Sequence, residues 1–156
     1  MTAHNKTRTA LEGARAINHL FEQMNELYHA AASKQGLSSS AFSILYSLYE
    51  CDSLSQKQLS DRAYIPKQTV SYTVKKLKEK GLVSEEAVDG RESRLSLTQR
   101  GAEQVEKDIS PVMEAEHAAL AALDEKHQRA IVDALGSYVA ELKNAFIESG
   151  LIDDRR

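Results

Sequence analysis

Apolar residues recur every three or four positions at both ends of this 156-residue chain, which predicts long amphipathic helices there. The first such stretch covers residues 8–33 and ends at Gly36. A second covers residues 98–123, with Pro111 inside it as an expected kink. Asp124 is placed to cap a last helix. The apolar face of that helix is wide and holds Ile131, Leu135, Tyr138, Val139, Leu142 and Phe146.

The middle of the chain has shorter elements with clear end signals. Ser38 is placed to cap a helix that leads to Cys51. Ser55 and Gln58 have the spacing of a capping box, which predicts a short helix to Ala63. After a turn at residues 64–65, Pro66 suits the first turn of a helix that ends before Gly81.

One β-hairpin follows these helices. Residues 82–88 and 91–97 are short runs joined by Asp89 and Gly90, a dipeptide that favours a type I′ turn between antiparallel strands. The pattern predicts no other β-structure. The expected fold class is therefore mainly α, with one hairpin as the wing of a winged helix-turn-helix.

Composition narrows the function classes. The chain has 20 basic and 23 acidic residues, and 42% of its residues are hydrophobic, as in an ordinary globular protein. A single cysteine excludes a disulfide framework and a four-cysteine zinc site. No apolar run has the length of a membrane span or of a signal peptide, so we expect a cytoplasmic protein.

The charge is distributed unevenly along the chain. Residues 55–80 hold seven basic and two acidic residues, whereas residues 102–156 hold six basic and twelve acidic ones. A basic module is therefore present in a chain that is acidic as a whole. Within it, Val70, Val74 and Leu77 have core spacing, so Gln68, Tyr72 and Lys75 are expected on the opposite, polar face.

A short helix, a tight turn, a basic-faced helix and a hairpin in this order predict double-stranded DNA as a partner, with the second helix in the major groove. Lysines neutralise phosphates, Gln68 and nearby hydroxyl groups address base edges, and Arg91 beside the turn is placed for the minor groove. The predicted DNA-binding residues are Ser38, Lys67, Gln68, Thr69, Ser71, Tyr72, Lys75, Lys76, Asp89, Arg91 and Arg94. A helical interaction module with a merely solvated basic face is the alternative.

These motifs resemble the MarR-type transcriptional regulators over nearly the whole chain. The resemblance rests on Ser38 with the apolar residues of its helix, on residues 59–77, on Gly81-Leu82-Val83, and on Asp89-x-Arg91 followed by Leu97-Thr98-x-x-Gly101. It implies a winged helix-turn-helix at residues 35–100 and a helical dimerisation region made of residues 1–34 and 101–156. It further implies that Arg91 contacts the minor groove, with Asp89 as its salt-bridge partner.

The wing departs from the family pattern. Glu85 and Glu86 stand where these wings usually carry a basic residue, and the loop before Asp89 is about two residues short. We therefore expect the two glutamates to repel phosphate.

The resemblance also implies a repressor that binds a near-palindromic operator as a homodimer and is released by a small molecule. His19, Tyr28, Tyr46 and Tyr49 are candidates to line a pocket for an aromatic or amphipathic effector between the first two helices. Aromatic residues at helical spacing are also typical of a plain core. Cys51 is a candidate redox sensor, but its acidic neighbours disfavour a reactive thiolate.

One arrangement points to an enzyme instead. Glu26 with His29, and Glu114 with His117, have the Glu-x-x-His spacing of di-iron helical bundles, and a metal-sensing site is a further alternative. A di-iron site needs two more helices that project glutamates, whereas the middle of this chain is a hairpin module. No nucleophile with an evident base and no phosphate-binding loop is present. We expect no enzyme activity, no metal and no cofactor.

Overall fold

The computed structural model describes residues 3–88 and 93–153, with side chains from residue 9 onward. It is mainly α-helical with a small sheet, which confirms the expected fold class. The chain forms two compact units, Met1–Val112 and Met113–Arg156. The functional division of residues 1–34, 35–100 and 101–156 is a different partition and stays a prediction.

The first two helices end close to where the sequence predicts, but the first begins at residue 3 rather than at the predicted residue 8. α1 spans Ala3–Lys34, and Gly36 after it has a φ of +68°. That conformation lets the Leu37 N–H donate to the carbonyl of Ala32 at 3.0 Å, which closes the helix end. α2 spans Ser39–Cys51, and its Ala41 N–H donates to Ser38 Oγ at 3.2 Å, so Ser38 is the expected cap.

The two helices of the helix-turn-helix begin and end close to the predicted residues. α3 spans Gln56–Ala63 and begins with the capping box of Ser55 and Gln58. Tyr64 follows in the left-handed conformation, with a φ of +53°. α4 spans Lys67–Glu79 after Pro66, and Gly81 beyond its end has a φ of +68°.

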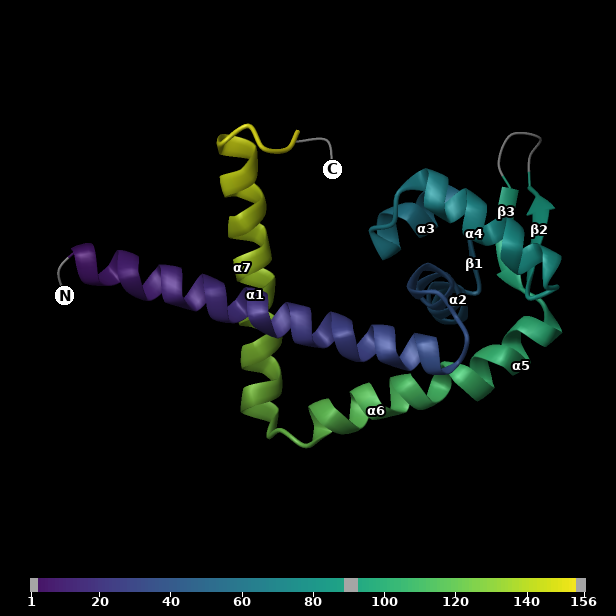
Figure 1. Ribbon diagram of the computed structural model, residues 1–156, viewed down its shortest axis with the longest axis horizontal. Helices are drawn as coiled ribbons and strands as arrows, with labels where there is room; N and C mark the ends of the chain where they lie inside the picture. The colour runs from purple at the N-terminus through teal and green to yellow at the C-terminus, as the bar shows by residue number, and fades with distance from the viewer. Residues whose placement is uncertain (1–2, 89–92, 154–156) are drawn as a thin grey trace. The chain divides into compact units, whose positions relative to one another are not determined.

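A three-stranded antiparallel sheet completes this part of the chain. Its strands are β1, Ser53–Leu54; β2, Val83–Ala87; and β3, Ser93–Leu97, in the spatial order β1-β3-β2. The hairpin of β2 and β3 is confirmed (Figure 1), while its expected turn at Asp89 and Gly90 lies outside the described residues. The prediction of no other β-structure was wrong, because β1 pairs with β3. Two residues are too few to show an alternating pattern, so only the tertiary pairing reveals this strand.

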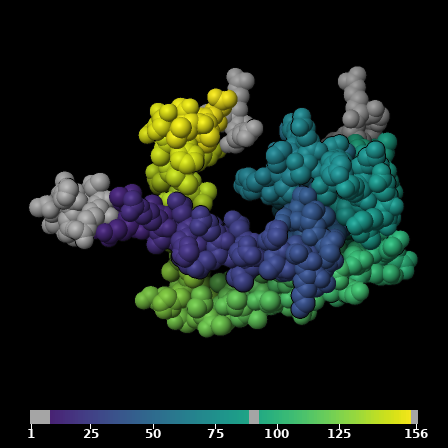
Figure 2. All heavy atoms as spheres, in the orientation of Figure 1, coloured from purple at the N-terminus to yellow at the C-terminus, as the bar shows by residue number. Residues whose placement is uncertain are grey.

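The core of the first unit lies between α2, the helix-turn-helix, the sheet and α5, which spans Gln99–Asp108. In Figure 2 the spheres of α2 in blue and of the helix-turn-helix and sheet in teal lie against one another without a gap at the surface. The largest fully buried side chains are Ile44, Leu45, Leu48, Leu59, Val70, Val74, Leu95, Val105 and Ile109. This core fixes the buried face of α4 against α2 and the base of the sheet.

The start of α5 is joined tightly to the end of α4. The Gly101 N–H donates to Thr98 Oγ1 at 2.9 Å, and that hydroxyl donates to the carbonyl of Gly81 at 2.7 Å. Gly101 is buried, and a Cβ on it would lie 1.9 Å from the carbonyl oxygen of Leu82. Only glycine fits at this position, which gives a physical reason for the Leu-Thr-x-x-Gly motif.

The helical stretch from residue 98 to residue 123 is two helices rather than one kinked helix. α5 ends at Asp108, and α6 spans Ser110–Ala121 after a break at Ile109. Pro111 lacks the N–H that a continuous helix would use, and its ring collides with a carbonyl one turn earlier. The expected kink is therefore corrected to an interruption.

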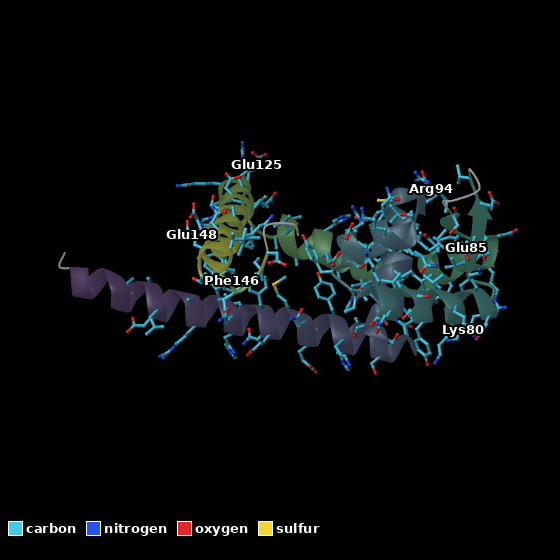
Figure 3. All side chains as sticks on the ribbon, turned by 90° about the horizontal axis from the view of Figure 1, so that it is seen from above. Lys80, Glu85, Arg94, Glu125, Phe146 and Glu148 are labelled. Atoms are coloured by element: carbon cyan, nitrogen blue, oxygen red, sulfur yellow. The ribbon has the colours of Figure 1, made fainter. Side chains whose placement is uncertain are left out.

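α7 spans Glu125–Glu148 in the second unit and begins as predicted. Asp124 caps it, because its Oδ1 accepts the His127 N–H at 3.0 Å. None of the residues of α7 is buried. Phe146, labelled in Figure 3, is one of several large apolar side chains that it exposes. The others include Ile131, Val132, Leu135, Val139 and Leu142.

Candidate nucleic-acid interface

The two faces of α4 separate as the sequence predicts. Val70, Val74 and Leu77 are buried, and so is Thr73, which shares a hydrogen bond of 3.2 Å with Ser40 of α2. The opposite side is exposed to solvent along the whole helix. It consists of Lys67, Gln68, Thr69, Ser71, Tyr72, Lys75 and Lys76. α4 therefore presents hydroxyl, amide and ammonium groups on one continuous surface, which we call the reading face.

The positive charge of the reading face is largely free. Within the described residues, neither Lys67 nor Lys75 has an acidic partner. The ammonium of Lys76 lies 4.5 Å from the ring centroid of Tyr72, and a hydrogen bond to Tyr72 raises the pKa of Lys76. By contrast, Arg62 donates to Glu50 Oε2 at 2.6 Å, away from this face. The free lysines are available to an external anion.

Ser38 is at the N-terminus of α2, where its oxygen is already in use. Ser38 Oγ accepts the Ala41 N–H and lies 3.2 Å from Ser40 Oγ. The residue is exposed. Its structural role is the helix cap, and a DNA contact by Ser38 stays a prediction.

Arg94 holds the base of the wing together. It stands opposite Glu86 in the strand pairing, is half-buried, and donates from Nη1 to the carbonyl of Ser53 at 3.4 Å. It therefore links β3 to the start of β1. Its predicted DNA contact is untested, and Asp89 and Arg91, the other wing candidates, lie outside the described residues.

The two adjacent glutamates of β2, Glu85 and Glu86, differ in their contacts and in their exposure. Glu85 accepts hydrogen bonds from Lys78 of α4 and from Ser93 of β3 (Figure 3 labels Glu85), and both lower its pKa, Lys78 more than Ser93. Glu86 is exposed. The expected repulsion of phosphate is corrected for Glu85, because Lys78 compensates its charge, and stays a prediction for Glu86.

One candidate DNA contact, Tyr64, was not predicted from the sequence. Tyr64, in the turn between α3 and α4, is 93% exposed and adopts the left-handed conformation. A bulky residue in that conformation costs roughly 1–2 kcal/mol, which a glycine would avoid. Its place in the turn just before the reading face was the signal available in the sequence.

None of the four candidate effector residues lines the groove that the structure describes in the first unit. His19 is exposed and hydrogen-bonds Gln23 at 2.9 Å, while the Tyr49 hydroxyl donates to Glu106 of α5 at 3.5 Å. Tyr28 and Tyr46 are half-buried. A surface groove of the first unit is lined by other residues, namely Gln35, Gly36, Leu37, Glu79, Lys80, Leu82, Arg100 and Gln104. The effector site stays a prediction.

The remaining alternatives gain no support from the geometry. Among the side chains of residues 9–88 and 93–153, no three histidine, cysteine, aspartate or glutamate residues gather as a metal site. Cys51 is a free, half-buried thiol. No helix in the described part of the chain combines the length and apolar character that crossing a membrane requires.

Comparisons with known proteins find similarity to the MarR family in the helix-turn-helix and wing, and a shared fold with solved regulators. The MarR family model matches residues 35–92. A comparison with curated proteins gives no match. Among solved structures, the chain is similar to a MarR transcriptional regulator from Methanosarcina mazei Go1, with 27% identity and a TM-score of 0.64 over 83% of this chain and 89% of that one.

Two further structures are similar. A probable transcriptional regulator from Pseudomonas aeruginosa has 26% identity and a TM-score of 0.61, over 78% of this chain and 96% of that one. MarR of Staphylococcus aureus, solved in complex with salicylate and kanamycin, has 21% identity and a TM-score of 0.71, over 92% of this chain and 99% of that one. The last likeness is one of fold alone.

Proposed function

We propose that this chain, which carries a MarR-type winged helix-turn-helix, is a homodimeric, sequence-specific DNA-binding transcriptional regulator. The reading face of α4 carries this proposal. It presents base-reading groups and unpaired lysines on one side of a helix whose other side is fixed in the core. A solvated basic face would account for the lysines, but not for a packed hairpin beside the helix.

The decisive experiment is selection of binding sites from random double-stranded DNA by the full-length chain. We expect enrichment of a near-palindrome with half-sites about 10 base pairs apart, because two recognition helices must reach successive major grooves. Anisotropy with the selected duplex and a scrambled duplex of equal composition then measures specificity, and affinity should fall steeply with salt. Equal binding of both duplexes would refute sequence-specific recognition.

The homodimer is supported by the apolar side chains of α7. A helix of 24 residues with no buried residue leaves more apolar surface in water than a soluble monomer usually tolerates. A second copy is the occupant that we infer, because two-fold recognition of a palindrome requires one. Sedimentation velocity at micromolar concentration should show a dimer, and a monomer at every concentration would contradict it.

We further infer that a small aromatic acid releases the DNA and that the protein acts as a repressor. The support is the MarR-type resemblance, a protein of the same fold that was solved with salicylate, and the tyrosines of α1 and α2. A ligand that prefers a dimer with misplaced recognition helices lowers DNA affinity by its differential affinity for the two states, about 5- to 150-fold for 1–3 kcal/mol.

A screen of phenolic acids against the complex with the selected duplex tests this inference. DNA binding by the wild type and by Cys51→Ser, each measured with and without peroxide, tests the alternative that Cys51 is a thiol sensor. One outcome would replace the effector inference with a thiol sensor. In that outcome no acid releases the DNA, and peroxide releases it from the wild type but not from Cys51→Ser.

A further inference from the structure

Glu85 joins the wing to the reading face. Both of its carboxylate oxygens are used: Oε2 accepts from the ammonium of Lys78, and Oε1 accepts from Ser93 Oγ at 2.6 Å. Lys78 belongs to α4, Glu85 to β2 and Ser93 to β3. One side chain therefore connects the recognition helix to both strands of the wing.

The position of Lys78 makes this connection relevant to DNA. Lys78 follows Ser71 by seven residues and Lys75 by three, so the three side chains lie along one stripe of α4. Ser71 and Lys75 belong to the reading face, and Lys78 continues it toward the wing. The Glu85 side chain is only 24% exposed, so water screens this ion pair less than it screens a fully exposed one.

We propose that Glu85 is a positioning residue for DNA recognition, which holds the wing against the recognition helix through Lys78 and Ser93. The inference rests on the proposed function. Both hydrogen bonds favour the ionised carboxylate and lower the pKa of Glu85, Lys78 more than Ser93. The helix and the wing then arrive at the DNA in one arrangement, so binding spends less free energy on ordering the wing.

A positioning role for Glu85 and simple charge repulsion predict opposite changes in DNA affinity when the carboxylate is neutralised. If Glu85 merely repelled phosphate, its neutralisation would tighten binding to every DNA and would also free Lys78 for a phosphate contact. If Glu85 positions the wing, its neutralisation weakens binding to the selected site. We expect a loss of about three- to tenfold, the size expected for ordering one loose element on binding.

The test compares Glu85→Gln with Glu86→Gln by anisotropy on the selected and scrambled duplexes. Glu86 is a matched control, because it is the next residue of β2, carries the same charge and is exposed. Glu85→Gln should weaken binding to the selected duplex only, and Glu86→Gln should leave it equal or tighter. Tighter binding of both duplexes by Glu85→Gln would overturn the proposal.

Amide hydrogen exchange of the DNA-free protein supplies a second readout. Glu85→Gln and Ser93→Ala should speed exchange in β2 and β3, and Glu86→Gln should not. If the wild type selects no duplex, the proposed function has failed, and exchange alone then decides whether Glu85 holds the wing. Unchanged exchange in both strands would overturn that role.

Discussion

Replacement of Gly101 by alanine changes the free energy of unfolding through two effects of opposite sign. Gly101 lies in the first turn of α5, with no left-handed φ that would require glycine. Helix propensity alone favours alanine there by about 1 kcal/mol. The added Cβ, however, would lie 1.9 Å from the Leu82 carbonyl oxygen and 2.9 Å from the Leu82 carbonyl carbon. Both atoms are backbone, so no side-chain rotation relieves the contact.

The structure allows the cost to be worked out. Real Cβ atoms essentially never lie closer than 3.0 Å to another heavy atom, so α5 and Leu82 must separate by more than 1 Å. That movement breaks the hydrogen bond of 3.1 Å from the Thr98 N–H to the Leu82 carbonyl. Unpaired buried groups cost about 1–3 kcal/mol, and an overfilled core costs a similar amount. After the propensity gain, Gly101→Ala should lose about 1–5 kcal/mol of unfolding free energy.

Urea denaturation followed by circular dichroism measures this loss at a fixed protein concentration. Gly136→Ala is the matched control, because Gly136 lies inside α7 and a Cβ there would meet nothing within 4 Å. It should gain up to about 1 kcal/mol. If Gly101→Ala proved as stable as the wild type, the close approach of α5 to Leu82 would be absent in solution and the reasoning would be refuted.

The remaining predictions concern the interfaces. Leu142→Asp should turn the dimer into a monomer in sedimentation, since each subunit loses roughly 1.5–3 kcal/mol of apolar burial and gains a charge; an unchanged dimer would place the interface elsewhere. Lys75→Ala should weaken binding to selected and scrambled duplexes alike and lower the salt slope by about one, whereas Gln68→Ala should change the preferred base. Equal losses on all sequences for Gln68→Ala would exclude it from base reading. Tyr64→Gly should raise stability by about 0.5–1 kcal/mol and weaken DNA binding, and unchanged affinity would remove Tyr64 from the interface.

The sequence predicts those features whose partners are neighbours along the chain. The caps by Ser38 and Asp124 and the capping box of Ser55 with Gln58 each join residues three apart, and all were found as expected. The exposed face of α4 likewise follows from helical periodicity alone. Such features depend on local geometry that a single sequence contains.

Features that depend on distant partners were missed or misjudged. Ser53 pairs with Ser96, and no pattern in a two-residue strand reveals that contact. The charge of Glu85 looked repulsive because its compensation by Lys78 arises only when β2 folds back along α4. The sequence shows that Tyr64 is an aromatic residue in a turn. Its exposure and backbone conformation, however, are consequences of how α3 and α4 pack.

The uncovered apolar surface of α7 has a consequence for the amount of protein in the cell. A single helix gains little from its own hydrogen bonds, and α7 buries no side chain within its own chain. If the proposed second copy supplies the missing burial, folding of this end becomes a second-order process governed by mass action. Newly made chains at low abundance then spend longer with α7 open to proteases, and their lifetime increases as the pool grows. Synthesis rate would thus set not only how many regulators exist but also how long each one lasts.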